Sequence, residues 1–177
     1  MSDTKVITGL VRFSYAHVFE PTAVNEGDTP KYSVSLIIPK DDKATIEKVK
    51  KAISAALQAG KASKFGGKLP RNYKDPLRDG DEERDGEEYE NSFFLNANTT
   101  TKPGVVDENV SPIIDRSEFY SGCYGRASIN FYAFNSNGNK GIACGLNHVQ
   151  KLKDGEPLGA QIASAEDDFG DFDDDLM

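Results

Sequence analysis

The sequence predicts a mainly β protein, a small barrel with one inserted helix, long loops and an acidic C-terminal tail. Apolar and polar residues alternate in several segments, as they do in strands with one buried face. One segment near residue 50 has helical spacing instead. Sixteen Gly and eight Pro supply turns. Because 177 residues suit one domain with an appendage, we place a domain at 1–158 and a disordered tail at 159–177.

Two strands and a helix are expected in the first third of the chain. Residues 6–15 and 32–38 alternate between apolar and polar. The helix that follows is capped by Asp41 or Asp42 and stopped at Gly60. Its apolar face is formed by Ile46, Val49, Ile53 and Leu57.

The remaining strands follow a long charged connection at 61–90. One strand is expected at 92–99, and short strands are expected at 105–106 and 113–114. The clearest pattern is a hairpin of 123–134 and 140–152, because the Asn-Gly pair between them favours a type I′ turn. An OB barrel is one arrangement of such elements. The periodicity alone leaves another small barrel or a sandwich open.

The two cysteines lie in this hairpin. The expected register places Cys144 opposite Phe131 and Cys123 opposite Leu152, so the cysteines are not neighbours. Structural zinc normally takes four ligands, and the chain has only two Cys and two His. We therefore expect two small core residues, with neither a disulfide nor a metal site.

The net charge of −8 is unevenly distributed. Residues 166–177 hold seven acids and no base, which leaves 21 basic and 22 acidic residues in the remainder. Residues 40–74 carry ten bases and three acids, whereas 75–90 carry nine acids and two arginines. The total charge therefore hides a basic region.

Several classes of protein are not indicated. The apolar runs are too short to span a bilayer, and nothing near Met1 has the pattern of a signal peptide, so a cytoplasmic location is expected. The sequence shows no nucleophile elbow, Walker A loop, dinucleotide fingerprint or zincin motif. We expect no cofactor and no enzymatic activity.

The strand at 123–134 indicates nucleic-acid binding. One of its faces is small and apolar, as a barrel interior requires. The other face carries aromatic, basic and amide groups, namely Tyr124, Arg126, Asn130, Tyr132 and Phe134. Aromatic rings stack on bases, at about 1–3 kcal/mol each, and Arg neutralises phosphate. For each ring, packing beneath the helix or a loop is the alternative.

Basic and aromatic residues also alternate in the connection after the helix. A flexible arm of this composition can close over a DNA strand. A solvated charged loop is the alternative, and the helical lysines are expected simply to face water. This segment contributes Lys64, Phe65, Lys68, Arg71, Tyr73 and Lys74 to the predicted DNA-binding set. Arg12, Phe94 and Lys102 complete it.

The acidic run at 75–90 allows a second function. Nucleases use clustered carboxylates with divalent ions. This run lies in a polar loop that contains Gly, whereas such carboxylates normally sit on rigid strands. A solvated loop, or ion pairs with the preceding bases, is therefore preferred over a metal-dependent nuclease. A barrel that binds only proteins is a third reading, against which the aromatic and basic face of 123–134 argues.

The tail is too acidic to pack into a core. Its acids surround aromatic and aliphatic residues, a pattern that suits a hydrophobic pocket with a basic rim on a partner and also resembles DNA. Because it is tethered, it would compete with DNA at high effective concentration. A simple solubility tail is the alternative. The residues expected to act are Phe169, Phe172, Asp173, Asp174, Asp175, Leu176 and Met177.

Several segments together resemble a known family: YSGCYGR at 120–126, NFYAF at 130–134, GNKGIACGLN at 138–147, QKLKDGEPL at 150–158 and EDDF at 166–169. The chain resembles the phage single-stranded-DNA-binding proteins with an OB fold that were formerly a domain of unknown function. The tip DFDDD at 171–175 is similar to that of bacterial single-stranded-DNA-binding proteins, but Leu176-Met177 replaces their Pro-Phe-type terminus.

The resemblance implies a five-stranded OB barrel and a role without catalysis. The protein would coat and protect single-stranded DNA during replication, recombination or repair, with little sequence preference. The tail would recruit replication proteins such as a polymerase, helicase or primase, and self-association is left open. Phage proteins, rather than host proteins, are the expected partners of the altered terminus.

Overall fold

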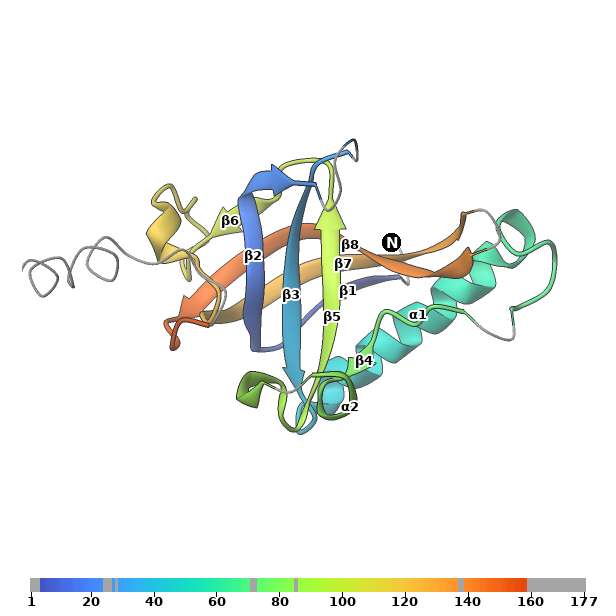
Figure 1. Cartoon of the computed structure of the whole chain (residues 1–177), viewed down its shortest axis with the longest axis horizontal. Coiled ribbons are helices and arrows are strands. Elements are labelled where there is room, and N and C mark those ends of the chain that lie inside the picture. The colour runs from blue at the N-terminus through green and yellow to red at the C-terminus, as the bar shows by residue number, and fades with distance from the viewer. Residues whose placement is uncertain are drawn as a thin grey trace, which may run out of the picture.

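A computed structural model describes residues 4–23, 27, 29–70, 73–84, 86–136 and 139–158 (Figure 1). Within these residues the protein is mainly β, as predicted. Its eight strands are β1 (Lys5–Ile7), β2 (Val11–Thr22), β3 (Lys31–Pro39), β4 (Arg78–Asp79), β5 (Ser92–Thr99), β6 (Gly104–Val106), β7 (Tyr124–Ser136) and β8 (Asn139–Lys153). The helices are α1 (Lys43–Ser63), α2 (Gly80–Glu83) and the 3-10 turns η1 (Glu87–Tyr89) and η2 (Arg116–Glu118).

Five of the described strands close a barrel. β2 pairs with β3, β3 with β5, β8 with β7, and β7 with β2, all antiparallel. A parallel contact between β5 and β8, at Asn98 and Gly145, completes the ring. This closed arrangement confirms the predicted five-stranded OB barrel. β1, β4 and β6 extend its edges, on β7, β5 and β8 respectively.

The barrel interior is filled by one side of each strand. Phe13, Leu36, Leu95, Ile129 and Phe131 are all fully buried there. Burial of each such side chain stabilises the fold by about 1.5–3 kcal/mol. The outward sides of the same strands remain available for binding, because alternate residues point away from the core.

Helix α1 packs against β7 (Figure 1). The Asp42 side chain caps it by accepting the Thr45 N–H at 3.1 Å, which confirms one of the two expected caps. The expected stop at Gly60 is wrong, since the helix continues to Ser63. Gly60 serves close packing instead, because a Cβ there would collide with Ala133 of β7.

The hairpin follows the expected register only near its turn. Cys144 faces Phe131 as predicted, but register shifts farther along place Tyr124 opposite Lys153, so the predicted pairing of Cys123 with Leu152 is wrong. Both cysteines are free and buried.

The expected strand at 6–15 is interrupted at Gly9-Leu10, where the Gly9 N–H donates to Thr45 Oγ1. Residues 113–114 are not a strand, although the Ile113 N–H donates to the Val105 carbonyl. The connection at 61–90 contains β4, α2 and η1, which the sequence did not predict.

Candidate nucleic-acid interface

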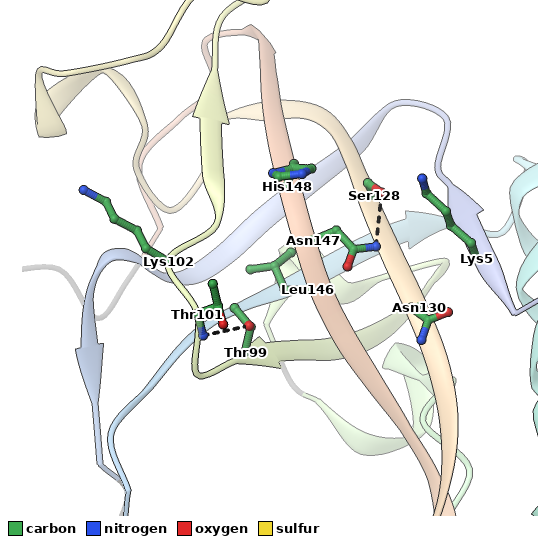
Figure 2. A pocket seen from close by; sticks show the side chains of 9 residues that line it. All are labelled: Lys5, Thr99, Thr101, Lys102, Ser128, Asn130, Leu146, Asn147 and His148. Carbon is green, nitrogen blue, oxygen red and sulfur yellow. Dashed lines mark hydrogen bonds between the residues drawn. The ribbon is translucent and has the colours of Figure 1, made fainter. Parts of the chain in front are cut away.

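A groove of about 630 Å³ opens on the outer side of β7 and β8 (Figure 2). Its walls come from β1, β7, β8, the last residue of β5 and the connection between β5 and β6. The lining residues are Lys5, Thr99, Thr101, Lys102, Ser128, Asn130, Leu146, Asn147 and His148. We refer to these nine residues as the main groove.

Strand register explains how these side chains meet. On β7, Ala127, Ile129 and Phe131 are buried, so Ser128 and Asn130 point outward. β1 adds a cation to the same surface, because Lys5 lies opposite Asn130.

A bulge turns β8 toward the main groove. Leu146 pairs with Ile129 and His148 pairs with Ser128, so Asn147 is an extra residue between two adjacent pairs. Bulges re-aim side chains in this way. The bulge therefore gives the main groove two consecutive polar residues, Asn147 and His148.

Hydrogen bonds fix the polar groups of the main groove. Asn147 donates from Nδ2 to Ser128 Oγ at 3.3 Å, and the Thr4 hydroxyl donates to Asn130 Oδ1 at 2.8 Å. The Gly104 N–H donates to His148 Nδ1 at 3.0 Å. Because Nδ1 accepts this bond, the Nε2 atom of His148 carries the ring proton and can donate to a ligand.

The charge of the main groove is positive. Lys5 and Lys102 are both exposed and stand on opposite sides of it (Figure 2). None of its nine lining residues is acidic. A polyanion would therefore meet two cations, separated by amide, hydroxyl and imidazole groups.

Tyr132 provides an exposed ring beside the main groove. Its side chain is 44% exposed, and a Cβ on Gly145 would lie 3.6 Å from the ring. The ring therefore lies over Gly145, which is itself opposite Asn130. An exposed ring beside a positively charged groove can stack on an unpaired base.

The start of β7 adds two more of the predicted residues. The Tyr124 ring is half-buried and lies 4.9 Å from Lys153 Nζ. Arg126 is exposed, and its guanidinium donates twice to Gln150 Oε1, at 3.0 and 2.7 Å. Both residues share the outward face of β7 with Asn130 and Tyr132.

Arg12 makes contacts that stabilise the fold. Its guanidinium lies 5.3 Å from the Tyr124 ring and donates to the carbonyls of Gly122 and Glu156, at 3.1 and 2.6 Å. It thus holds the chain that follows β8 against β2.

The basic segment after α1 reaches the other end of β7. Lys74 donates its N–H to the Lys140 carbonyl and accepts from the Ile142 N–H, each at 3.0 Å. This places Lys74 beside Gly141 and the half-buried Phe134 ring. Tyr73 packs partly against the core. Burial, followed by the nearby Asp75 charge, raises the pKa of Tyr73.

Two of the predicted rings are not available to DNA. Phe65 is 4% exposed and packs within the core, near Gly60 of α1. Phe94 is fully buried with Ile37 and Tyr89, and the Arg84 guanidinium lies 4.6 Å from its ring. The prediction that these rings face DNA is therefore wrong, because Phe65 packs beside α1 and Phe94 is covered by Tyr89 of η1.

The other predicted cations are exposed or lie outside the described residues. Lys64 and Lys68 are exposed where α1 ends. Arg71 lies outside the described residues, as does the tail at 159–177 with Phe169, Phe172 and the residues at 173–177.

Three of the acids before β5, namely Asp79, Asp81 and Glu83, form ion pairs. Lys40 Nζ lies 2.9 Å from Asp79 and 2.8 Å from Asp81, and Arg78 pairs with Glu83. The hydrogen bond from Lys40 lowers the pKa of Asp81, and that from Arg78 lowers the pKa of Glu83. In the described part of the chain, no three His, Cys, Asp or Glu side chains are grouped to hold a metal ion. The ion-paired arrangement does not favour a nuclease.

A family comparison decides the class of protein. The model for the family described as "Enterobacter phage Enc34, ssDNA-binding protein" matches residues 4–177. The chain belongs to this family. Because the family is one of single-stranded-DNA-binding proteins, its members are binding proteins and not enzymes.

Individual relatives agree with this assignment. "Putative protein p50" of Acyrthosiphon pisum secondary endosymbiont phage 1 is 35% identical over 175 residues, which cover 92% of this chain and 91% of the relative. The structure titled "Single-stranded DNA-binding protein from bacteriophage Enc34 in complex with ssDNA" has a TM-score of 0.78 and 28% identity, and the match covers 88% of this chain and 90% of that one.

A more distant structure shares the fold. The single-stranded-DNA-binding protein gp2.5 of bacteriophage T7 has a TM-score of 0.62 at 16% identity, with 94% of this chain and 93% of that chain covered. Among the described residues, no helix has the length and apolar character that a membrane span requires.

Sequence reasoning missed seven of the nine residues of the main groove, namely Lys5, Thr99, Thr101, Ser128, Leu146, Asn147 and His148. The alternation of β7 was a sufficient signal for Ser128. Lys5 reaches the main groove because β1 pairs with β7, and His148 reaches it because of the bulge in β8. Neither the pairing nor the bulge has a local sequence signal.

Proposed function

We propose that this phage-family protein binds single-stranded DNA along the outward face of β7, with its centre in the main groove. The carrying observation is that Lys5 and Lys102 flank a groove without acids, beside the exposed Tyr132 ring. Lysines neutralise phosphates wherever the strand is placed, and a ring stacks on any base. The expected binding therefore has little sequence preference.

The outward face of β7 extends the interface beyond the main groove. Tyr124 and Arg126 precede it, and Phe134 with Lys74 follows it. Phe134 lies ten residues after Tyr124, which is about 33 Å along a strand. A surface of this length can contact several nucleotides, in agreement with the site sizes of about 4–16 nucleotides found for OB folds. The relative whose title names a complex with ssDNA supports the same ligand for this chain.

The acidic tail is proposed to regulate this surface. Leu158, the last described residue, packs against the cluster of Ile37, Tyr89 and Phe94 on the outer side of β3 and β5. The acidic tail at 159–177 follows Leu158 in the sequence. Tethering gives it a high effective concentration near the DNA surface, so its acids would compete with phosphates.

The biological role follows from these two properties. The protein coats and protects DNA strands exposed during phage replication, recombination or repair, in the cytoplasm of a host bacterium. When DNA displaces the tail, the residues from Phe169 to Met177 become available to replication proteins such as a polymerase, helicase or primase.

A fluorescence titration tests the proposal. Labelled oligothymidylate is titrated with the intact chain and with a chain ending after Ala165, over a series of salt concentrations. Tail deletion should tighten binding, most strongly at low salt, and log K should fall with log salt at about −0.7 per phosphate contact. If neither the intact nor the tail-deleted chain bound DNA at about 50 mM salt, DNA binding would be disproved. Equal affinity of the two chains would disprove only competition by the tail.

A further inference from the structure

A second cleft, of about 590 Å³, lies along the part of β2 from Ser14 to Thr22. It is also lined by η2, by Ser121 and by Leu158, and none of its lining residues belongs to the main groove. Its aromatic residues are Tyr15, Phe19, Phe119 and Tyr120. We refer to it as the aromatic cleft.

Tyr15 is held in an uncommon conformation. The pairing of β2 with β3 shifts between Ser14, which faces Ser35, and His17, which faces Ser33. In this irregular stretch Tyr15 has a φ of 47°, in the left-handed region that a bulky residue rarely adopts. Its side chain is nevertheless 53% exposed. Such strain persists where the surroundings enforce it, and it is common at ligand sites.

Neighbouring groups fix the geometry around Tyr15. The adjacent Ala16 N–H donates to Ser121 Oγ at 3.0 Å. The Tyr120 hydroxyl accepts the Gly155 N–H at 3.1 Å and lies 3.0 Å from Asp154 Oδ1, so this ring is also anchored. An exposed Tyr15 ring that lines one cleft with the anchored Tyr120 ring provides a preformed stacking surface.

A row of four polar residues and one glycine connects the aromatic cleft with the main groove; we refer to it as the polar row. His17 faces Ser33, Ser33 faces Asn98, Asn98 pairs with Gly145, and Gly145 faces Asn130. The residues next to this row along each strand, including Val34, Ala97 and Cys144, are buried in the barrel. The row therefore lies on the outward side and crosses β2, β3, β5, β8 and β7. Its groups can hydrogen-bond to sugar and base edges without blocking a strand that passes over them.

The charges in the aromatic cleft suit bases better than phosphates. The cleft contains Glu20, Glu88 and Arg116, and Arg116 pairs with Glu20. A further cation, the exposed Lys31, lies opposite Thr22 of the cleft. A base can enter such a cleft while its phosphates remain outside, near Lys31.

We infer that the aromatic cleft is a base-stacking subsite for single-stranded DNA, with Tyr15 as its stacking ring. This inference rests on the proposed function and extends it, because a strand bound in the main groove would continue along the polar row to the aromatic cleft. Long strands then use both sites, whereas short strands use the main groove alone.

The test compares oligothymidylates of about 4 and about 16 nucleotides, which bracket the site sizes of single OB folds. Tyr15→Asn removes the ring but keeps a residue that tolerates the left-handed region, and Tyr15→Phe keeps the ring. Leu10→Ala, immediately before β2, is the control for loss of an exposed apolar side chain. Tyr15→Asn should weaken binding of the long strand by roughly 5- to 150-fold and leave the short strand unchanged. Tyr15→Phe and Leu10→Ala should bind both strands normally.

Photocross-linking of the intact, unaltered protein provides a second readout that does not depend on how the variants fold. A long strand containing 5-iodouracil should give an adduct at Tyr15. Unchanged binding by Tyr15→Asn together with no adduct at Tyr15 would overturn the subsite. Tighter binding of both strands by Tyr15→Asn would overturn it too, because it would mean that the cleft holds a competing segment of this chain. If the unaltered protein bound neither strand, the proposed function itself would fail.

Discussion

Lys5 lies directly opposite Asn130 in the pairing of β1 with β7. A three-residue strand thus adds a cation to the face of β7 that already presents amide and aromatic groups. Lys102 supplies a second cation from the connection between β5 and β6. These two lysines, which flank the main groove, are the basis of the first prediction.

Replacing Lys5 and Lys102 with Gln should weaken DNA binding and reduce its salt dependence. Each lost phosphate contact reduces the magnitude of the slope of log K against log salt by about 0.7. Anisotropy titrations at several salt concentrations measure both quantities. Lys48→Gln, on the exposed side of α1, is the matched control. If the control lowered the slope as much as the groove variants, general charge rather than the main groove would be responsible.

Tyr132→Ala should weaken binding by about 1–3 kcal/mol, because it removes a ring that can stack on a base. The slope against salt should not change, since no charge is lost. Tyr132→Phe should bind normally. A normal affinity for Tyr132→Ala would exclude this ring from the interface.

Phe94→Ala should lower the stability of the protein and leave its DNA affinity unchanged, in contrast to Tyr132→Ala. Phe94 is fully buried against Ile37 and Tyr89, so the variant should lose about 3–5 kcal/mol of unfolding free energy, measured with urea. The folded fraction should still bind DNA with unchanged affinity. Weaker binding without loss of stability would show that Phe94 does contact DNA.

The ion pair of Asp81 with Lys40 predicts a dependence of stability on pH. The hydrogen bond that Lys40 donates to Asp81 holds the pKa of Asp81 below the ordinary value, so the folded state binds a proton at Asp81 less readily than the unfolded state. The resulting stability is complete above the unfolded pKa and is lost as the pH falls through the folded pKa. Between about pH 5 and pH 3, the unaltered protein should therefore lose more stability than Asp81→Asn. Parallel urea curves for the two proteins at both pH values would contradict this assignment.

Both cysteines should resist modification in the folded protein. Burial raises the pKa of Cys123 and of Cys144, which keeps both thiols protonated. Iodoacetamide at pH 8 should label neither until urea unfolds the chain. Rapid labelling of the folded protein would show that one thiol is accessible.

The parts of the fold that depend on local pattern could be predicted from the sequence. The period of two in β7 placed Asn130 and Tyr132 on the outer face, and the Asn-Gly turn set the pairing of Cys144 with Phe131. The helical spacing of Ile46, Val49 and Ile53 indicated α1.

The parts that depend on distant packing could not be predicted. Phe94 has the outward position that alternation assigns to it, but Tyr89 of η1 covers it, and nothing in a charged connection indicates that cover. The bulge at Asn147 shifts the register by one residue and turns His148 outward. The main groove needs both this bulge and the pairing of β1 with β7, so only Asn130 and Lys102 of its residues were predicted.

The most direct test of the central claim is an anisotropy titration of labelled oligothymidylate at about 50 mM salt. It compares the unaltered protein with a variant that carries Lys5→Gln, Lys102→Gln and Tyr132→Ala together. Binding at the main groove predicts that the unaltered protein binds and that the triple variant, while still folded, binds far more weakly. Equal binding by the two proteins, or no binding by the unaltered protein, would contradict it.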